Sequence, residues 1–189
     1  MSNKDRQRRI ILDLAVTLDG FIEGKNGEVD WCIMDSDMMF TDFLNQIDTI
    51  LYGRKSYDLW GQFSPKTNDA TEKELWRLVH SKDKYVFSRT QTGMNHKATF
   101  INDNIFEEVM ILKNKPGKDI WLYGGASLIT TFINLGLVDE FRLSVHPVIL
   151  GEGKPLFNDI KQRLNVKLAQ TKTFSSGVVQ LIYHWNGNE

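Results

Sequence analysis

The stretch DIWLYGGASL, residues 119–128, constrains the fold more than any other segment of this chain. An apolar run, Ile120–Tyr123, stops at Gly124-Gly125, and apolar residues then recur at helical spacing over 128–133. This pattern predicts a strand that leads into a helix through two residues without a Cβ atom. Such a bend lets the backbone lie very close to another group, which could be a neighbouring helix or a phosphate.

Two further bends of the same kind follow predicted strands. At 50–60 the chain reads ILYGRKSYDLW, where a strand ends at Gly53 and a short helix opens with Arg54–Ser56. At 85–90 it reads YVFSRT, where a strand ends in Ser88-Arg89. Free N–H groups at a helix start favour anions, and an arginine can bind two oxygens of one phosphate.

The three bends together are stronger evidence for a binding site than any one of them alone. Ligands of open α/β sheets bind beyond the carboxyl ends of the strands, and all three bends would lie on that edge. They therefore predict a site for a dinucleotide with an extra phosphate, such as NADPH. Each bend alone also has a simpler explanation, which is a tight turn, a helix cap or a solvated charge.

Strand and helix patterns alternate through the first part of the chain, whereas the last 50 residues read as successive strands. The predicted fold is therefore a single α/β domain over 1–189, with a mostly parallel central sheet, flanking helices and an antiparallel C-terminal edge hairpin. The turn of that hairpin falls at Ser175–Gly177. The predicted strands are 9–16, 49–52, 84–87, 98–101, 120–123, 140–145, 166–173 and 178–184. The predicted helices are 36–46, 55–59, 71–80, 106–114 and 127–135.

Composition excludes several classes of site. The single cysteine, Cys32, rules out an internal disulfide and a cysteine-based zinc site. The histidines have no metal-ligand spacing, so no metal site is predicted for His80, His96, His146 or His184. The net charge of −1 and the scattered basic residues argue against nucleic-acid binding. No apolar run approaches a membrane span, and no signal-peptide pattern precedes the first strand, so a cytoplasmic protein is expected.

Several segments, taken in order, resemble the dihydrofolate reductase-like superfamily. They are IILDLAVTLDGFIEG, GRKSYDLW, VFSRT, WLYGGASLI and VDEFRLSVHPVILGEGKPLF. Within the superfamily, the chain is most similar to the RibD C-terminal domain, the reductase of riboflavin biosynthesis, and its stand-alone relatives. The resemblance implies a dihydrofolate reductase-like fold and NADPH-dependent reduction of a planar nitrogen heterocycle. Such a substrate is a pteridine or a ribosylaminopyrimidine like 5-amino-6-(5-phosphoribosylamino)uracil.

The resemblance also implies roles for individual residues. The backbone around Ala15 in the first strand and the turn Asp19–Phe21 after it would flank the nicotinamide. The substrate would lie against Trp31 and Phe21. Ser88 and Arg89 would recognise the 2′-phosphate of the adenosine, which favours NADPH over NADH. The remaining cofactor contacts would come from Gly53, Arg54, Lys55, Ser56, Tyr123, Gly124, Gly125, Ala126 and Ser127.

Two positions depart from the family pattern. Riboflavin reductases are expected to carry Glu immediately before the glycine pair, where this chain has Tyr123. Dihydrofolate reductases usually carry Tyr shortly after the pair, where this chain has Ile129. The zinc deaminase half that often accompanies riboflavin reductases has no counterpart in this sequence.

Reduction of a C=N or C=O bond also requires a proton, and a carboxyl group with a raised pKa in an apolar pocket is the usual source. The stretch EVDWCIMDSDMMFTDF offers Asp30, Asp35, Asp37 and Asp42. We predict Asp37 as the proton donor and Asp19 as the second candidate. The alternatives are that Asp35, Ser36 or Asp37 caps the following helix and that Asp19 serves its turn.

Two broader questions stay open at this point. A non-catalytic nucleotide-binding or regulatory protein could use the same scaffold, because a fold does not determine function. Related reductases form dimers, and the segment 139–148 is predicted to be an edge ribbon that pairs with a second copy.

Met38, Met39 and Phe43 are predicted to belong to the core.

Overall fold

A computed structural model of the protein describes residues 6–66, 68–95, 97–185 and 187. His96, one of the histidines considered above, lies outside the described residues.

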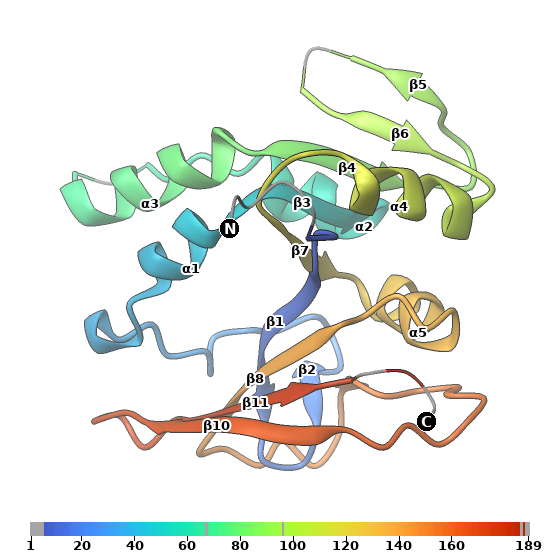
Figure 1. Ribbon diagram of the computed structural model, residues 1–189. Helices are drawn as coiled ribbons and strands as arrows, with labels where there is room; N and C mark the ends of the chain where they lie inside the picture. Colours follow the sequence, from blue (N-terminus) through green and yellow to red (C-terminus); the bar gives the residue numbers. More distant parts are fainter. Residues whose placement is uncertain (1–5, 67, 96, 186, 188–189) are drawn as a thin grey trace.

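Among the described residues, nine strands form one central sheet (Figure 1). Strands β8, β1, β7, β3, β4 and β6 run parallel, whereas β11 and β5 are antiparallel to the neighbours they flank. This arrangement confirms the predicted α/β class and the antiparallel C-terminal hairpin. From edge to edge the strands are β10 (Lys167–Thr173), β11 (Val179–His184), β8 (Glu140–His146), β1 (Ile10–Thr17), β7 (Asp119–Gly124), β3 (Ile47–Gly53), β4 (Asp83–Phe87), β6 (Thr99–Ile101) and β5 (Gly93–Met94). A small second sheet pairs β2 (Phe21–Glu23) with β9 (Lys154–Pro155).

Helices cover both faces of the sheet. Helices α1 (Phe40–Gln46) and α3 (Ala70–His80) lie on one face, and α4 (Ile105–Asn114) and α5 (Ala126–Asn134) lie on the other (Figure 1). Alternate residues of the strands therefore enter two separate apolar clusters. In β1, Ile10 and Leu12 pack with α4 and α5, whereas Ile11 packs with α1. Of the helices that the structure describes, none has the length and apolar character needed to cross a membrane.

The predicted helix over 36–46 is interrupted. A short 3₁₀ turn, η1 (Ser36–Met38), is followed by Met39 at φ 49°, and α1 begins only at Phe40. A left-handed residue breaks the helical hydrogen-bond pattern, and Met39 is 58% exposed, so its predicted place in the core was wrong. Phe43 is buried as predicted.

The segment 139–148 does not form a sheet edge, which corrects the predicted pairing surface. Strand β8 is paired on one side with β1 and on the other with β11. The C-terminal hairpin therefore occupies the side of β8 that was predicted to be free. The edge on this side of the sheet is β10, whose seven residues are all exposed.

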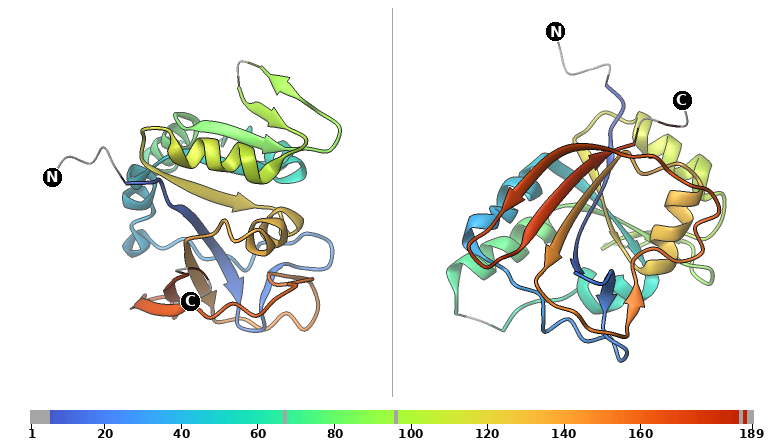
Figure 2. Two further views of the ribbon diagram at one scale, coloured as in Figure 1. Left: turned by 45° about the vertical axis from the view of Figure 1, so that its right-hand side comes forward. Right: turned by 90° about the horizontal axis from the view of Figure 1, so that it is seen from below.

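Strands β1 and β7 part near the middle of the sheet. Their paired residues end at Leu12 and Leu122, although β1 continues to Thr17 and β7 to Gly124. Each strand remains paired on its other side, β1 with β8 and β7 with β3. The left view of Figure 2 shows the two strands fanning apart toward their carboxyl ends. We call this opening the β1–β7 fork; its walls begin at Asp13 and Tyr123.

Candidate functional site

The structure brings the three predicted bends to one edge of the sheet. Strands β7, β3 and β4 are neighbours and run parallel, so their carboxyl ends lie side by side. In register, Tyr52 is paired with Gly124, and Gly53 is paired with Phe87, the residue before Ser88. The glycine pair, the Gly53 bend and the Ser88 bend therefore follow one another along the same rim.

The two glycine bends approach each other so closely that a Cβ atom at either would make a tight contact, which its neighbour could relieve only by moving a few tenths of an ångström. A Cβ atom at Gly53 would lie 3.3 Å from the carbonyl oxygen of Gly124, and one at Gly125 would lie 3.1 Å from Ser56 Oγ. Gly124 and Gly125 also have φ angles of 113° and 67°, which favour glycine.

Helix α5 starts directly after the contact between the two bends. The N–H groups of Leu128 and Ile129 donate to the carbonyl oxygen of Gly125, at 2.8 and 3.0 Å. Those of Ala126 and Ser127 are therefore the ones that can serve an anion.

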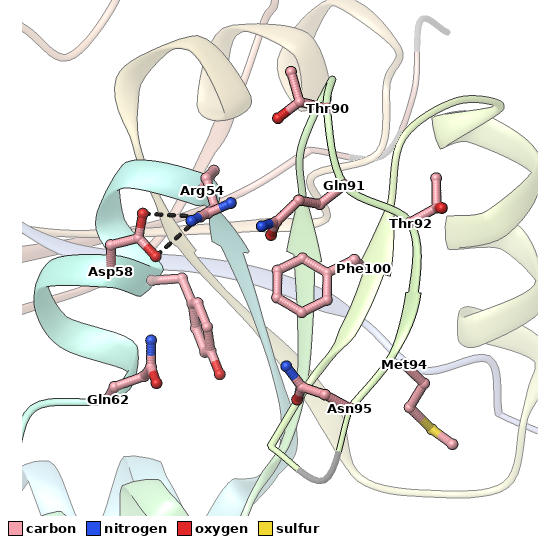
Figure 3. Close-up of a pocket in the computed structure, with 10 residues that line it drawn as sticks. Arg54, Asp58, Gln62, Thr90, Gln91, Thr92, Met94, Asn95 and Phe100 are labelled. Carbon is pink, nitrogen blue, oxygen red and sulfur yellow. Dashed lines mark hydrogen bonds and ion pairs between the residues drawn. The ribbon is translucent and has the colours of Figure 1, made fainter.

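A groove of about 550 Å³ extends from the Gly53 bend toward β6 (Figure 3). Arg54 points toward Gln91 across it, and Arg54 Nε donates to both carboxylate oxygens of Asp58, at 2.9 and 2.8 Å. The Arg54 and Asp58 side chains are 37% and 45% exposed, so an incoming anion can compete for this guanidinium. The lining residues come from α2 (Arg54–Ser56), the π-helical turn η2 (Tyr57–Gly61) and the residue after it, the segment between β4 and β6, and β6 itself; they are Arg54, Tyr57, Asp58, Gln62, Thr90, Gln91, Thr92, Met94, Asn95 and Phe100.

Ser88 and Arg89 have different surroundings. Ser88 is buried, and its hydroxyl oxygen accepts hydrogen bonds from the N–H groups of Thr90 and Gln91, at 3.3 and 3.2 Å. Ser88 therefore shapes the bend that places Thr90 and Gln91 in the groove. Arg89 is exposed and is not among the residues that line the groove. In the described part of the groove, the cationic side chain is that of Arg54.

Tyr123, the residue that replaces the expected Glu, lies in an aromatic cluster at the fork. Its ring centroid is 4.9 Å from that of Tyr52 and 5.1 Å from that of Trp121. Burial raises the pKa of Tyr123, and the nearby Cys32 and Glu23 raise it further. The hydroxyl group therefore stays protonated at physiological pH and is available as a hydrogen-bond donor.

The turn at Asp19 is tied to a distant loop. The Asp19 carboxylate accepts from Thr17 Oγ1 at 2.6 Å and from the backbone N–H groups of Leu150 and Gly151, at 3.3 and 2.8 Å. These hydrogen bonds, led by that of Thr17, lower the pKa of Asp19. The group is therefore ionised at neutral pH, which makes it a poor source of protons. Phe21, two residues later, donates its N–H to Thr17 Oγ1 at 2.9 Å.

Trp31 and Asp37 lie beside β8 and the β10–β11 hairpin. The half-buried Trp31 ring meets the buried His146 ring edge-on, with a centroid separation of 5.3 Å. Asp37 is exposed and accepts hydrogen bonds from the N–H and hydroxyl groups of Ser175, both at 3.3 Å. Asp37 thus fastens η1 to the turn of the β10–β11 hairpin, and its role as a proton donor stays a prediction.

Asp13 is a carboxyl group within the predicted strand 9–16, for which no functional role was predicted. Its side chain is buried on the α1 face of the sheet, opposite Arg142 in the register of β1 and β8. Burial raises the pKa of Asp13 to about 7; Glu140 raises it as well, and Arg142 and Lys172 act in the opposite direction. The signal in the sequence was a single acidic residue inside the apolar run IILDLAV.

Residues 8–180 match the RibD C-terminal domain. The chain belongs to the RibD C-terminal domain family. An uncharacterized Bacillus subtilis relative, YyaP, is 79% identical over 188 residues, which cover 99% of this chain and 100% of YyaP.

Solved structures with this fold include a candidate riboflavin biosynthesis protein from Shewanella sp. PV-4, with a TM-score of 0.75 and 22% identity over 94% of this chain and 99% of that one. They also include dihydrofolate reductase from Enterococcus faecalis in complex with NADP(H), with a TM-score of 0.65 and 16% identity over 96% and 98% of the two chains. At these identities the likeness concerns the fold. The predicted superfamily and the RibD C-terminal type are thereby confirmed.

Within this RibD C-terminal domain, the second departure from the family pattern also has a structural explanation. Ile129 is buried beneath the glycine pair, and a Cβ atom at Gly124 would lie 2.9 Å from Ile129 Cδ1. The isoleucine therefore supports the bend from the core and does not project from it.

Proposed function

We propose that this protein is an NADPH-dependent reductase of a planar nitrogen heterocycle, of the pteridine or ribosylaminopyrimidine class that includes 5-amino-6-(5-phosphoribosylamino)uracil. The observation that carries the proposal is the alignment of three anion-compatible bends along one rim, with a groove that continues from them. Membership of a reductase-type family supports the same class of reaction. The fit to the cofactor rests on Gly53, Gly124 and Gly125, whose missing side chains leave the backbone open to a pyrophosphate.

In this proposal the cofactor lies along the rim from the groove to the fork. The adenosine end occupies the groove beside Arg54, with Ser88 and Arg89 near the 2′-phosphate. The bends at Gly53 and Gly124 hold the pyrophosphate, assisted by Lys55 and Ser56 and by the α5 start at Ala126 and Ser127. The nicotinamide end reaches Ala15 and Tyr123, and the substrate lies against Phe21 and Trp31.

Bound NADPH would supply the hydride. The task of the chain is then to orient the two rings, exclude water and provide a proton to the substrate nitrogen or oxygen. We also propose that the protein acts in the cytoplasm as a homodimer on a small-molecule substrate, without nucleic acid.

The test of the proposed function is a titration with NADPH followed by a substrate panel. Quenching of the five tryptophans measures cofactor binding, and loss of nicotinamide absorbance with pterins and ribosylaminopyrimidines measures turnover. Binding with turnover supports the reductase. Binding without oxidation by any member of the panel favours the alternative, a nucleotide-binding or regulatory protein, and absence of binding contradicts both.

Cofactor choice is tested by two arginine variants. If Arg89 reads the 2′-phosphate, Arg89→Ala weakens NADPH binding about tenfold or more and leaves NADH binding nearly unchanged, because one charge-assisted contact is lost. Arg54→Ala is the comparison, since Arg54 lines the groove directly. Equal weakening of NADPH and NADH by Arg89→Ala contradicts its assigned role. Phosphate-specific weakening confined to Arg54→Ala would transfer that role to Arg54.

A further inference from the structure

Asp13 stands at the point where β1 and β7 part. Leu12 and Leu122 form the last pair between the two strands, so Asp13 and Tyr123 are the first residues of the fork walls. Successive strand residues alternate between faces, which places Asp13 on the same face as Ile11 and therefore on the side of α1 and Trp121. The Trp121 indole N–H donates to the backbone oxygen of Asp13 at 2.9 Å and fixes this position.

The Asp13 carboxylate has no hydrogen-bond partner among the described residues, although it is only 9% exposed. Arg142, its neighbour in the register, is bound elsewhere. The Arg142 guanidinium donates to Glu140 and, at 3.2 Å, to Gln46 of α1. A buried carboxyl group without a partner is costly in a folded protein, which suggests that a ligand supplies the missing contact.

Other acidic residues have different environments. Asp35 also has a carboxylate oxygen, Oδ2, that is buried without a hydrogen-bond partner, but the residue is only half-buried and lies in a loop outside the sheet. Asp19 and Asp37 are exposed and hydrogen-bonded. Asp119 and Glu140 are buried, but each is paired with arginine side chains, which keep a carboxylate ionised. Asp13 is therefore the buried carboxyl group of this face that is free to exchange a proton with a bound molecule.

We propose that Asp13 is the proton donor in the reduction proposed above, on which this inference rests. The substrate carbon of a C=N or C=O bond gains the hydride and its two electrons from the nicotinamide, and the π bond breaks. The Asp13 carboxyl group gives its proton to the substrate nitrogen or oxygen. The resulting carboxylate regains a proton from solvent after product release.

The surroundings of Asp13 suit this role. Charged groups face it from two strands: Arg142 and Glu140 of β8 and Lys172 of β10. On the same face, β7 and α1 contribute the aromatic rings of Trp121, Phe40 and Phe43. The opposite wall of the fork contributes Tyr123, whose raised pKa keeps its hydroxyl group protonated. Burial raises the pKa of Asp13 to about 7. At neutral pH the carboxyl group can therefore give a proton to the substrate, and the resulting carboxylate can take up another proton from solvent.

The test compares Asp13→Asn, Asp13→Glu and Asp37→Asn with the natural chain over a range of pH. Tryptophan quenching by NADPH reports cofactor binding, and absorbance at the nicotinamide band reports turnover of an accepted heterocycle. Asp13→Asn is expected to bind NADPH normally and to lose about 100-fold or more in kcat. The remaining kcat of Asp13→Asn is expected not to fall above pH 7, whereas the kcat of the natural chain does fall. Asp13→Glu, which keeps an acid, recovers part of the rate.

A second readout does not require turnover. The Asp13 carboxyl carbon is followed by NMR as a function of pH, with and without NADP⁺. The cationic nicotinamide ring of NADP⁺ is expected to lower the pKa of Asp13 if the ring reaches the fork, whereas Asp83, at the opposite ends of the strands, is unaffected.

Each outcome decides between the two proposals. Full activity and an unchanged pH profile in Asp13→Asn, or loss of the pH dependence in Asp37→Asn alone, overturns the role of Asp13 and leaves the reductase intact. An Asp13 titration that NADP⁺ does not move, in a protein that binds it, also overturns that role. Absence of any nucleotide binding overturns the proposed function and, with it, this inference.

Discussion

Asp13 occupies a strand position whose neighbours, Leu12 and Leu14, are apolar, and its burial makes its charge expensive. Because burial raises the pKa of Asp13 from its ordinary value of 3.8 to about 7, the folded chain holds a proton that the unfolded chain releases. The stabilising effect of that proton is complete below about pH 4 and is lost as the pH rises through 7. A group that suits proton transfer thus weakens the fold under neutral conditions.

Asp13→Asn should remove this dependence. Between pH 5 and pH 8 we expect the free energy of unfolding of the natural chain to fall by about 2–3 kcal/mol more than that of Asp13→Asn. Urea denaturation at the two pH values measures the difference. Asp83→Asn, which alters an exposed carboxylate, is the matched control and should follow the natural chain. Parallel losses in all three proteins would show that Asp13 does not titrate in this range.

At the scale of the elements, the contact between two bends defines the rim of the site. Gly53 ends β3 and Gly124 ends β7, and their backbones lie so close that even a Cβ atom at Gly53 would be only 3.3 Å from the Gly124 carbonyl oxygen. Gly53 has φ −71° and ψ 150°, a conformation open to any residue. Its glycine is therefore required by the neighbouring bend and not by its own backbone.

Gly53→Ala should consequently separate the two bends without straining the chain at position 53. We expect it to weaken NADPH binding about tenfold and to lower the free energy of unfolding by about 1–2 kcal/mol. Gly177→Ala provides the contrast, because Gly177 has φ 86°, a Cβ atom there would make only an ordinary contact with Pro147, and the residue lies in the turn of the C-terminal hairpin, away from the groove. That variant should cost stability through backbone strain and leave NADPH binding unchanged. Unaltered cofactor affinity in Gly53→Ala would count against a pyrophosphate at this contact.

Much of this arrangement could be predicted from the sequence. The bends at Gly53, Ser88 and Gly124 were located because glycine pairs and polar residues stand out at the ends of apolar strands. The raised pKa of Asp13 could not be predicted, since the burial of this residue depends on the pairing of β1 with β8, a strand that lies far along the chain. The free edge predicted over 139–148 was wrong for a similar reason, because the pairing of β8 with β11 is a long-range choice.

At the scale of the whole molecule, the fork divides the sheet into two halves. One half contains β10, β11, β8 and β1, and the other contains β7, β3, β4, β6 and β5. The register of β1 and β7 joins them through Ile10, Ile11 and Leu12 only. In the proposed function, the phosphates contact the second half and the nicotinamide reaches the first, so one ligand bridges both.

NADPH should therefore stabilise the two halves together. At a concentration of about 100 times its Kd, we expect the free energy of unfolding to rise by about 2.7 kcal/mol and the Tm by roughly 5–10 °C. Hydrogen exchange shows where this stabilisation acts, and amide protection is expected in β1 beyond Asp13 as well as in β7. Protection confined to β7, β3 and β4 would mean that the ligand does not reach the fork.

The order of the chain adds a consequence for how the protein is made. Strand β1 is synthesised first, yet its partners β7 and β8 leave the ribosome only after residues 124 and 146 have been added. Until then, the apolar first strand has exposed backbone groups on both sides, a condition that invites chaperones or unwanted association. The wall that carries Asp13 is thus translated before every other strand of this sheet, and it finds both of its neighbours only after β8 has been made.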